Sequence, residues 1–304
     1  MKVKEFYNQL IHIIDETKVK LDESMANHTT FRIGGNADIF VTPTNIEEIK
    51  EIITLCQEQE MPFYIVGNGS NLLVGDKGYR GLIIQIYSEM NQIIVEDDYI
   101  KAEAGALLSK IASKALANSL TGFEFASGIP GTLGGAVFMN AGAYGGEMKD
   151  ILYNVTALTP DGTIMVIPKE ELELGYRTSV VSKRKYIVLS AMIKLQQGEK
   201  QKISDRMEEL KEQRTTKQPL EFPSAGSTFK RPVGHFTGKL IQEAGLCGFQ
   251  VGGAAISEKH CGFVINKDHA TAKDVVVLMQ QVSEKIEEQF GVILEPEIKK
   301  LGEF

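Results

Sequence analysis

The chain contains no tryptophan and few of the residues that mark specialised classes of protein. Its 304 residues include three cysteines, nine prolines and five histidines. Cysteines that are odd in number and form no C-x-x-C pair argue against a disulfide-rich secreted scaffold, and the scattered histidines have no metal-ligand spacing. We therefore expect no metal, and we interpret Cys56, Cys247 and Cys261 as buried, reduced thiols of a cytoplasmic protein.

Long apolar runs and an excess of positive charge are also missing. No stretch approaches the ~18 consecutive apolar residues of a membrane-spanning helix, and residues 1–20 lack the apolar core of a secretory signal. The formal net charge is −7, which argues against sequence-independent binding to nucleic acid or to an anionic membrane. The composition, 43% hydrophobic and 24% charged, is that of a globular protein. We therefore expect neither nucleic acid nor membrane as a partner.

Glycine, in contrast, is concentrated in residues 127–146, which read SGIPGTLGGAVFMNAGAYGG. Glycine is costly to order, so such a cluster is useful mainly where the backbone needs φ > 0 or must lie against a ligand. Free N–H groups in loops of this kind form concave nests for phosphate oxygens. The alternative is a run of tight turns at a domain crossing.

Another glycine cluster comes earlier in the chain: GNGSN at residues 67–71, between the apolar runs 63–66 and 72–74. In chain order, residues 67–71 are the first glycine cluster and residues 127–146 are the second. The first cluster and its flanking runs predict a strand, a tight loop and a strand. Leu72 stands where a Rossmann loop would carry its third glycine, and the lysine of a P-loop is missing. If these loops bind phosphate, they do so outside the two commonest architectures.

The periodicity of the chain predicts an α+β protein in three parts: residues 1–90, 91–198 and 199–304. In the first part we expect a helix over 4–15 and a βαβ-like unit, with Asn45 at the start of its helix. The second part should hold a hairpin over 93–104, a helix over 107–118 and further antiparallel strands. For the third we expect a helix at 204–214, a helix at 237–245 that is capped by Thr237, and strands over 251–257 and 261–266. A helix capped by Thr271 and a last strand over 292–299 should follow.

Three short segments carry polar groups suited to chemistry. Residues 175–179, GYRTS, place an arginine beside a tyrosine, and guanidinium suits bidentate binding of carboxylate or phosphate. Residues 223–231, PSAGSTFKR, present hydroxyls and cations, and residues 294–298 contain two acids that would share one face of a strand. The simpler readings are a solvated arginine, an ordinary hydroxyl-stabilised turn and an exposed strand end.

Taken in order, these segments resemble the UDP-N-acetylenolpyruvoylglucosamine reductase family nearly end to end. The resemblance rests on FRIGG (31–35), GNGSNLLV (67–74), SGIPGTLGGAVFMNAGAYG (127–145), GYRTS (175–179), PSAGSTFK (223–230) and LEPE (294–297). It implies the FAD-binding fold of vanillyl-alcohol oxidase (PCMH) type in two subdomains, plus a C-terminal α+β substrate domain whose last strand returns to the active site.

The implied activity is the NADPH-dependent reduction of UDP-N-acetylglucosamine enolpyruvate to UDP-N-acetylmuramate, through non-covalently bound FAD. This reaction serves peptidoglycan synthesis, and with it cell wall biogenesis, cell shape and cell division. The implied partners are the UDP-sugar and NADPH, and we expect a cytoplasmic monomer.

The resemblance also implies site residues. Arg177 would face the substrate carboxylate, Ser227 would donate a proton to C2, and Glu297 would accompany them. Substrate-binding residues would be Tyr176, Lys217, Lys230 and Arg231. The cofactor would be held by Gly67, Asn68, Gly69, Ser70, Asn71, Gly128, Pro130, Gly131, Gly134, Gly135, Ala136, Asn140 and Gly142.

The sequence departs from the family pattern at two points, and two other functions remain possible. The short interval between Arg177 and Ser227 indicates the shorter form of the family, without the insertion that bears a substrate-covering tyrosine. Arg231 replaces a common asparagine, and we hypothesise that it contacts the diphosphate. The alternatives are another oxidase or dehydrogenase of the same flavin fold, and a catalytically silent sugar-nucleotide sensor. The chain lacks a His or Cys attachment signal for covalent flavin, and the joint presence of Arg177, Ser227 and Glu297 argues against the sensor.

Overall fold

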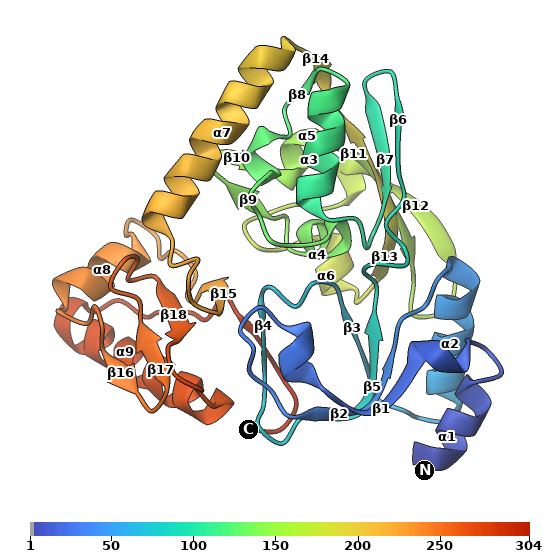
Figure 1. Cartoon of the computed structure of the whole chain (residues 1–304), viewed down its shortest axis with the longest axis horizontal. Helices are drawn as coiled ribbons and strands as arrows, with labels where there is room; N and C mark the ends of the chain where they lie inside the picture. The colour runs from blue at the N-terminus through green and yellow to red at the C-terminus, as the bar shows by residue number, and fades with distance from the viewer. Residues whose placement is uncertain (1–2) are drawn as a thin grey trace. The chain divides into compact units, whose positions relative to one another are not determined.

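The structure is a computed structural model that describes residues 3–304 and contains two compact units (Figure 1). Unit 1 takes the chain up to Lys20, then Ile39–Asn68 and Leu82–Arg214. Unit 2 takes Leu21–Asp38, Gly69–Gly81 and Thr215–Phe304. The three-part division expected from the sequence stays a prediction. Both units are built from separated stretches of chain, a feature that local patterns do not reveal.

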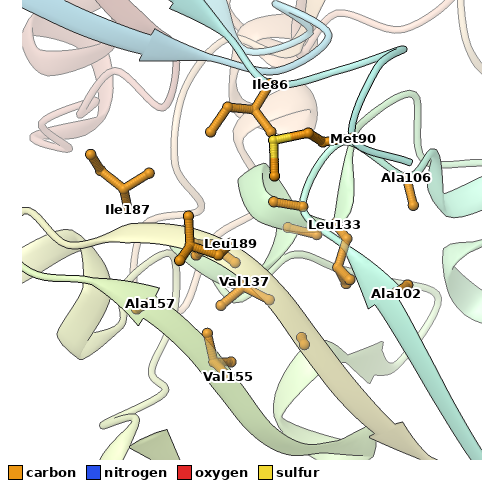
Figure 2. Close-up of a cluster of buried hydrophobic side chains, with 14 of the residues drawn as sticks. Ile86, Met90, Ala102, Ala106, Leu133, Val137, Val155, Ala157, Ile187 and Leu189 are labelled. Atoms are coloured by element: carbon orange, nitrogen blue, oxygen red, sulfur yellow. The ribbon is translucent and has the colours of Figure 1, made fainter. Parts of the chain in front are cut away.

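Unit 1 contains a five-stranded antiparallel sheet in the order β12-β11-β13-β7-β6. Its strands are β6 (Ile93–Glu96), β7 (Tyr99–Glu103), β11 (Leu152–Leu158), β12 (Ile164–Pro168) and β13 (Ile187–Lys194). Helix α4 (Leu133–Phe138) packs on it, and Figure 2 shows Leu133 and Val137 among the buried side chains of β11 and β13. The glycine-rich segment is thereby anchored to a rigid sheet.

The βαβ-like unit expected near the N-terminus is also present in unit 1. Helix α2 (Ile46–Glu58) starts at Asn45, whose side chain accepts a hydrogen bond from the Glu48 amide (2.9 Å). Strand β3 (Phe63–Val66) runs parallel to the second half of β5 (Tyr79–Gln85). The first glycine loop begins directly after β3. The position of this loop is therefore set by a strand that pairs in parallel with the buried half of β5.

Unit 2 is organised around an antiparallel sheet in the order β15-β18-β17-β16 and the long helix α9 (Ala272–Phe290). The capping box of α9, Thr271 with Asp274, forms as the sequence predicts, and Gly291 ends the helix in the left-handed conformation. A parallel pair joins β4 (Leu72–Val74) to β19 (Lys299–Leu301). The remaining strands of the sheet are β15 (Ser224–Ser227), β16 (Gln250–Val251), β17 (Ala254–Ile256) and β18 (Phe263–Asn266).

The remaining helices and strands complete the two units. Among helices they are α1 (Val3–Leu10), η1 (Glu16–Lys18), η2 (Met25–His28), α3 (Leu108–Ala117), η3 (Glu124–Ala126), α5 (Met148–Ile151), η4 (Lys169–Glu171), α6 (Val180–Lys183), α7 (Lys200–Lys217) and α8 (Thr237–Glu243). Among strands they are β1 (Val19–Ser24), β2 (Asn36–Val41), β8 (Leu120–Thr121), β9 (Gly142–Ala143), β10 (Gly146–Glu147) and β14 (Gln196–Gln197).

Several sequence predictions were wrong. Cys247 and Cys261 form a disulfide, and only Cys56 is a buried free thiol. The sequence does not reveal this pairing, because the two positions meet only through the folding of the α8–β18 segment. The predicted strand 292–299 is irregular up to residue 298, apart from an isolated bridge between Phe229 and Pro296, because Pro296 has no N–H to donate to a ladder. Thr237 opens α8 as its first residue rather than as its cap.

Candidate active site

The two glycine clusters meet within unit 1. The Asn68 side-chain amide donates a hydrogen bond to the Pro130 carbonyl (3.0 Å). A Cβ placed on Gly67 would come within 3.3 Å of the Thr132 side chain, and the Gln85 amide donates to the Gly67 carbonyl (3.0 Å). Glycine is therefore required at position 67 by the close approach of the second loop. The structure brings together residues that stand more than sixty positions apart.

The loops leave backbone donors unused. In unit 1 the amides of Gly128 and Thr132 donate to no acceptor within residues 3–304, and Thr132 is 2% exposed. In unit 2 the same holds for the amides of Gly69, with φ 61°, and Ser70 across the described chain. Buried N–H groups almost always have a partner. Such unused donors fit an anionic ligand of the kind that a nest binds.

Other amides of residues 127–146 already donate hydrogen bonds within the protein. Fewer of them are therefore available to a phosphate than the sequence suggests. Residues 133–138 form helix α4 rather than an open turn. Within it, the Gly134 amide donates to the Ala104 carbonyl (2.8 Å), and a Cβ on Gly134 would lie 3.1 Å from that of Ala104. Ala136 is buried in the same helix, and the Gly131 amide bonds to Ile129. Gly134 is thus explained by packing.

Gly135 has no such explanation. It is exposed, its φ is not positive, and a Cβ there would meet only the Thr132 hydroxyl at 3.7 Å, an ordinary contact. Alanine would suit a helix better by about 1 kcal/mol. The protein itself does not require glycine here. The surface of α4 at Gly135 is open to a ligand, and the residues present therefore fit a large cofactor.

Arg177 stands in a tight turn closed by hydrogen bonds between Gly175 and Thr178. Its φ is 57°, and its guanidinium carbon lies 5.0 Å from the Tyr176 ring centroid. The Asn140 side chain donates to the Gly175 carbonyl (3.0 Å) and so secures the turn. Arg177 and Tyr176 are thus presented together by a turn that the glycine-rich segment supports.

Asn140 is a fully buried anchor. Its amide nitrogen also donates to Glu147 (2.9 Å), and its oxygen accepts from the Lys149 amide (2.9 Å). The hydrogen bond from Lys149 lowers the pKa of the Glu147 carboxyl, and the charge of Arg177 adds to this lowering. A Cβ on Gly142 would lie 2.7 Å from the Glu147 side chain. Hydrogen bonds therefore explain the asparagine at position 140, and close packing explains the glycine at position 142.

Ser227 and Glu297 both belong to unit 2. Ser227 ends β15 and is exposed, and its hydroxyl has no hydrogen-bond partner among the described residues. Glu297 is half-buried, its amide donates to the Thr228 carbonyl (2.8 Å), and its carbonyl accepts from the Asn71 side chain (3.3 Å). Within unit 2, the end of the first glycine loop, the segment with Ser227 and the segment with Glu297 form one connected group.

The substrate-binding cations predicted from the sequence differ in their surroundings. Lys230 forms an ion pair with Glu295 (2.9 Å), whose carboxyl pKa is lowered by that hydrogen bond. Arg231 lies 3.8 Å over the Phe236 ring centroid. Lys217, the last residue of α7, is exposed and forms no ion pair within residues 3–304. Lys217 is therefore the cation most open to a ligand.

Sequence reasoning missed Arg214. This α7 residue lies against the second glycine cluster, since its Cδ would be 3.1 Å from a Cβ placed on Gly128, and burial lowers the pKa of its guanidinium. The signal was its spacing from the two buried residues of α7, Ile203 and Leu210, which places all three on one side of an otherwise polar helix. A half-buried arginine that has no acid partner within residues 3–304 and lies next to unused amides adds positive charge to this part of unit 1.

Residues 3–304 contain no group of histidine, cysteine and acidic side chains that could hold a metal ion. None of the helices described there is long and apolar enough to cross a membrane. A surface groove of about 730 Å³ in unit 1, lined by Tyr87, Leu107 and Lys110 among others, contains none of the residues predicted for the site.

Comparison with protein families divides the chain in two. Residues 37–167 match the family described as FAD binding domain. Residues 218–301 match the family described as UDP-N-acetylenolpyruvoylglucosamine reductase, C-terminal domain. The first match covers both glycine clusters, and the second covers Ser227 and Glu297.

Curated relatives match nearly end to end. Proteins named UDP-N-acetylenolpyruvoylglucosamine reductase are 52% identical in Clostridium botulinum (strain Eklund 17B / Type B), over 96% of each chain, and 52% identical in Alkaliphilus oremlandii, over 98% of each. The protein of that name from Clostridioides difficile is 48% identical over the whole of both chains.

Solved structures agree with these relatives. The crystal structure of UDP-N-acetylenolpyruvylglucosamine reductase from Thermus caldophilus matches with a TM-score of 0.80 and 37% identity, over 93% of this chain and 98% of that one. A grass pollen allergen with glucose dehydrogenase activity matches with a TM-score of 0.51 and 13% identity, over 64% of this chain and 44% of that one. The second match concerns the fold alone.

Proposed function

Because the chain belongs to the UDP-N-acetylenolpyruvoylglucosamine reductase family, we propose which of its residues carry out that family's reaction and what each contributes. The protein is an FAD-containing oxidoreductase that reduces UDP-N-acetylglucosamine enolpyruvate with NADPH as reductant, in peptidoglycan precursor synthesis. Its fold is mixed α and β, with the FAD-binding fold followed by the C-terminal domain of the family. The roles of individual residues are our proposal.

The observation that carries the proposal is the junction of the two glycine loops. Gly67 and Asn68 contact the loop at Pro130 and Thr132, nearby amides are unused, and Gly135 leaves space that packing does not explain. We assign the diphosphate of FAD to the amides of these loops, with Arg214 as an additional cation. When bound, FAD would supply the hydride-transfer chemistry between NADPH and the substrate. The residues assigned to contact FAD are Gly67, Asn68, Gly69, Ser70, Asn71, Gly128, Pro130 and Gly135. Gly131, Gly134, Ala136 and Gly142 shape the loop and helix beside them, and Asn140 is a buried support.

The reacting group needs a cation and a proton donor. Hydride addition at C3 leaves negative charge at C2 and in the adjoining carboxylate, and preorganised positive charge stabilises such a state. Arg177, presented by its turn, supplies that charge. Ser227 donates the proton to C2, for which an exposed hydroxyl without a protein partner among the described residues is available. Glu297 accompanies it on the neighbouring segment.

The sugar-nucleotide end is assigned to cations and one aromatic ring. We assign Lys217 and Lys230 to the diphosphate or the carboxylate of the substrate. Tyr176, which is 50% exposed, offers a ring for stacking. Arg231 is stacked on Phe236, an arrangement that holds its guanidinium in one orientation. A preoriented guanidinium suits a diphosphate, and this supports a direct contact between Arg231 and the diphosphate of the substrate.

We also propose where the enzyme works. NADPH and UDP-sugars are cytoplasmic metabolites, so we assign the protein to the cytoplasm, as a monomer. Its product would there sustain wall growth, cell shape and cell division.

The test separates the two half-reactions by stopped-flow absorbance. Ser227→Ala and Glu297→Gln should leave the NADPH-dependent loss of flavin absorbance unchanged, and should slow its return on addition of the enolpyruvyl substrate by about a hundredfold or more. Equal slowing of both half-reactions would refute the assigned roles. An unchanged second half-reaction in either variant would make that residue structural.

A further inference from the structure

Thr228 stands between the two residues assigned to proton transfer, and it is the point at which their segments are joined. It follows Ser227 directly, it is 2% exposed, and its backbone and side chain make three hydrogen bonds within unit 2. Its amide donates to the Gly262 carbonyl (2.9 Å) and its carbonyl accepts from the Glu297 amide (2.8 Å). The same residue therefore contacts the strand beside Ser227 and the segment of Glu297.

The hydroxyl of Thr228 takes the place of a main-chain acceptor. The pairing of β15 with β18 shifts register between Ser224 and Ser227, at Gly226 with φ 79°. Beyond this irregularity, the Val264 amide donates to the Thr228 Oγ1 at 2.8 Å. Val264 is fully buried, so no water can replace that acceptor without rearrangement. Loss of the Thr228 hydroxyl would leave the buried Val264 N–H without an acceptor, which is unfavourable enough to displace the segment.

The segment of Glu297 is held from both sides. Its amide is bound to Thr228, and its carbonyl accepts from the Asn71 side chain at 3.3 Å. The same two segments are joined again two residues away, where the Lys230 amide donates to the Glu295 carbonyl (2.8 Å). Thr228 therefore sets where the carboxylate of Glu297 can lie relative to the hydroxyl of Ser227.

We propose that Thr228 is a positioning residue for the second half-reaction: its buried hydroxyl, bound to the Val264 amide, holds Ser227 and Glu297 in the mutual arrangement that protonates the substrate. The inference rests on the roles proposed above for Ser227 and Glu297. It adds a residue that does not touch the substrate and acts through its neighbours. Positioning errors of ~1 Å cost about a hundredfold in rate, so a small displacement is sufficient.

The test compares Thr228→Val, which keeps the shape and removes the hydroxyl, with Thr228→Ser, which keeps the hydroxyl. We expect Thr228→Val to slow flavin reoxidation by the enolpyruvyl substrate about tenfold to a hundredfold, with NADPH-dependent flavin reduction unchanged. Thr228→Ser should restore most of the rate. Binding of the product UDP-N-acetylmuramate to the oxidised enzyme, measured by calorimetry, should weaken in Thr228→Val and not in Thr228→Ser.

Thr271→Ala is the matched control for stability, because it removes the N-cap of α9 in the same unit and destabilises that helix. It should lower the melting temperature without changing either half-reaction. The inference is overturned if Thr228→Val slows both half-reactions alike, if it changes only the melting temperature, or if Thr228→Ser fails to restore the rate. Ser227→Ala and Glu297→Gln are measured in parallel, and if neither slows reoxidation, the proposed function fails and the inference with it.

Discussion

Arg177 combines a proposed catalytic charge with an unfavourable backbone. At the third position of a tight turn it has φ 57°, where glycine or asparagine is usual. The left-handed conformation costs an L-residue about 1–2 kcal/mol. Residues held this way are found where the surrounding structure dictates them, often at functional sites. Here the hydrogen bond from Asn140 to the Gly175 carbonyl contributes to holding the turn.

A first prediction separates strain from chemistry at this residue. Arg177→Gly should relieve about 1 kcal/mol of strain relative to Arg177→Ala, and should melt at a higher temperature than that variant. Both variants should lose about a hundredfold in the substrate half-reaction, because the guanidinium is gone in each. Thermal unfolding and stopped-flow absorbance measure the two effects. A glycine variant less stable than the alanine variant would show that the turn is not strained.

A second prediction concerns His260. Partial burial lowers the pKa of its imidazole, whose Nδ1 lies 3.1 Å from the Gly262 amide as an acceptor. Above about pH 6.5 the imidazole is neutral in the folded and unfolded chains alike. Below that pH the unfolded chain binds a proton that the folded chain resists, so stability should fall as the pH is lowered from about 6.5. The fall ends below the lowered folded pKa.

Urea unfolding at about pH 7.5 and about pH 5.5, on either side of the ordinary imidazole pKa, tests this dependence. The wild type should lose more stability between these values than His260→Gln, which cannot take up the proton. His12→Gln, which removes an exposed imidazole, is the matched control for the substitution itself. If His260→Gln and the wild type respond identically to pH, the titration of this ring does not affect stability.

At the scale of single elements, α4 is a helix built against its own propensity. Glycines at its second and third positions weaken it, and only Gly134 is required by the contact with Ala104. The same helix carries Leu133 and Val137 into the core of unit 1, as Figure 2 shows. Packing thus stabilises what local preference disfavours.

The third prediction follows from Gly135. Gly135→Ala should raise the stability of the FAD-free protein by about 0.5–1 kcal/mol, because alanine favours the helix and the Cβ meets no close atom. The same methyl group should weaken FAD binding if the cofactor lies against α4. Fluorescence titration with FAD and thermal unfolding of the FAD-free protein measure the two effects. Gly162→Ala, at a turn remote in sequence, is a control for FAD affinity, and unchanged affinity in Gly135→Ala would remove α4 from the cofactor site.

A fourth prediction concerns the disulfide between the turn after α8 and the turn between β17 and β18. Cys247 and Cys261 are separated by 14 positions, and closing a loop of this size stabilises by about 3 kcal/mol. Cys247→Ser should therefore lower the melting temperature, and dithiothreitol should lower that of the wild type to the same extent. Dithiothreitol should not affect Cys247→Ser itself. A wild-type protein insensitive to the reductant would indicate that the bond does not form in solution.

Thiol titration gives an independent check of the same bond. Burial raises the pKa of the Cys56 thiol to about 12, so this residue should react with iodoacetamide only after unfolding. The native, oxidised protein should then show no reactive thiol, and mild reduction should expose Cys247 and Cys261 alone.

At the scale of the whole molecule, the chain passes repeatedly between its two units. The residues assigned to the reaction divide between them, with Arg177 in unit 1 and Ser227 and Glu297 in unit 2. The first glycine loop itself changes unit between Asn68 and Gly69. Ligand binding should therefore change amide exchange in defined stretches of both units.

The fifth prediction uses hydrogen exchange to map these stretches. FAD should slow amide exchange over residues 67–70 and 128–135, where unused donors gain partners, and UDP-N-acetylmuramate should slow it over 224–231 and 294–298. Helix α9, away from both assignments in sequence, should exchange at an unchanged rate over most of its length. Protection confined to other segments would contradict the assignment of the cofactor to the glycine loops.

Features that depend on neighbours along the chain can be predicted from the residues alone. Asn45 and Thr271 are recognisable as helix starts because a cap bonds to an amide only three residues away. The ordered motifs identify the family, and the matches of residues 37–167 and 218–301 confirm it. The hairpin of β6 and β7 is predictable as well, since its turn lies between two alternating strands.

Features that join distant segments emerge only in the folded chain. Folding pairs Cys247 with Cys261, places Arg214 against Gly128, replaces the expected strand 292–299 by an irregular segment, and joins Thr228 to Glu297. The disulfide and the contact of Thr228 with Glu297 have no local signal, because each depends on which surfaces meet when the apolar faces are buried. Arg214 and Pro296 carry only a partial signal, the spacing of Arg214 on α7 and the missing N–H of Pro296. Hydrogen-bonding needs of buried backbone then select the partners, and those needs arise only after the chain has folded.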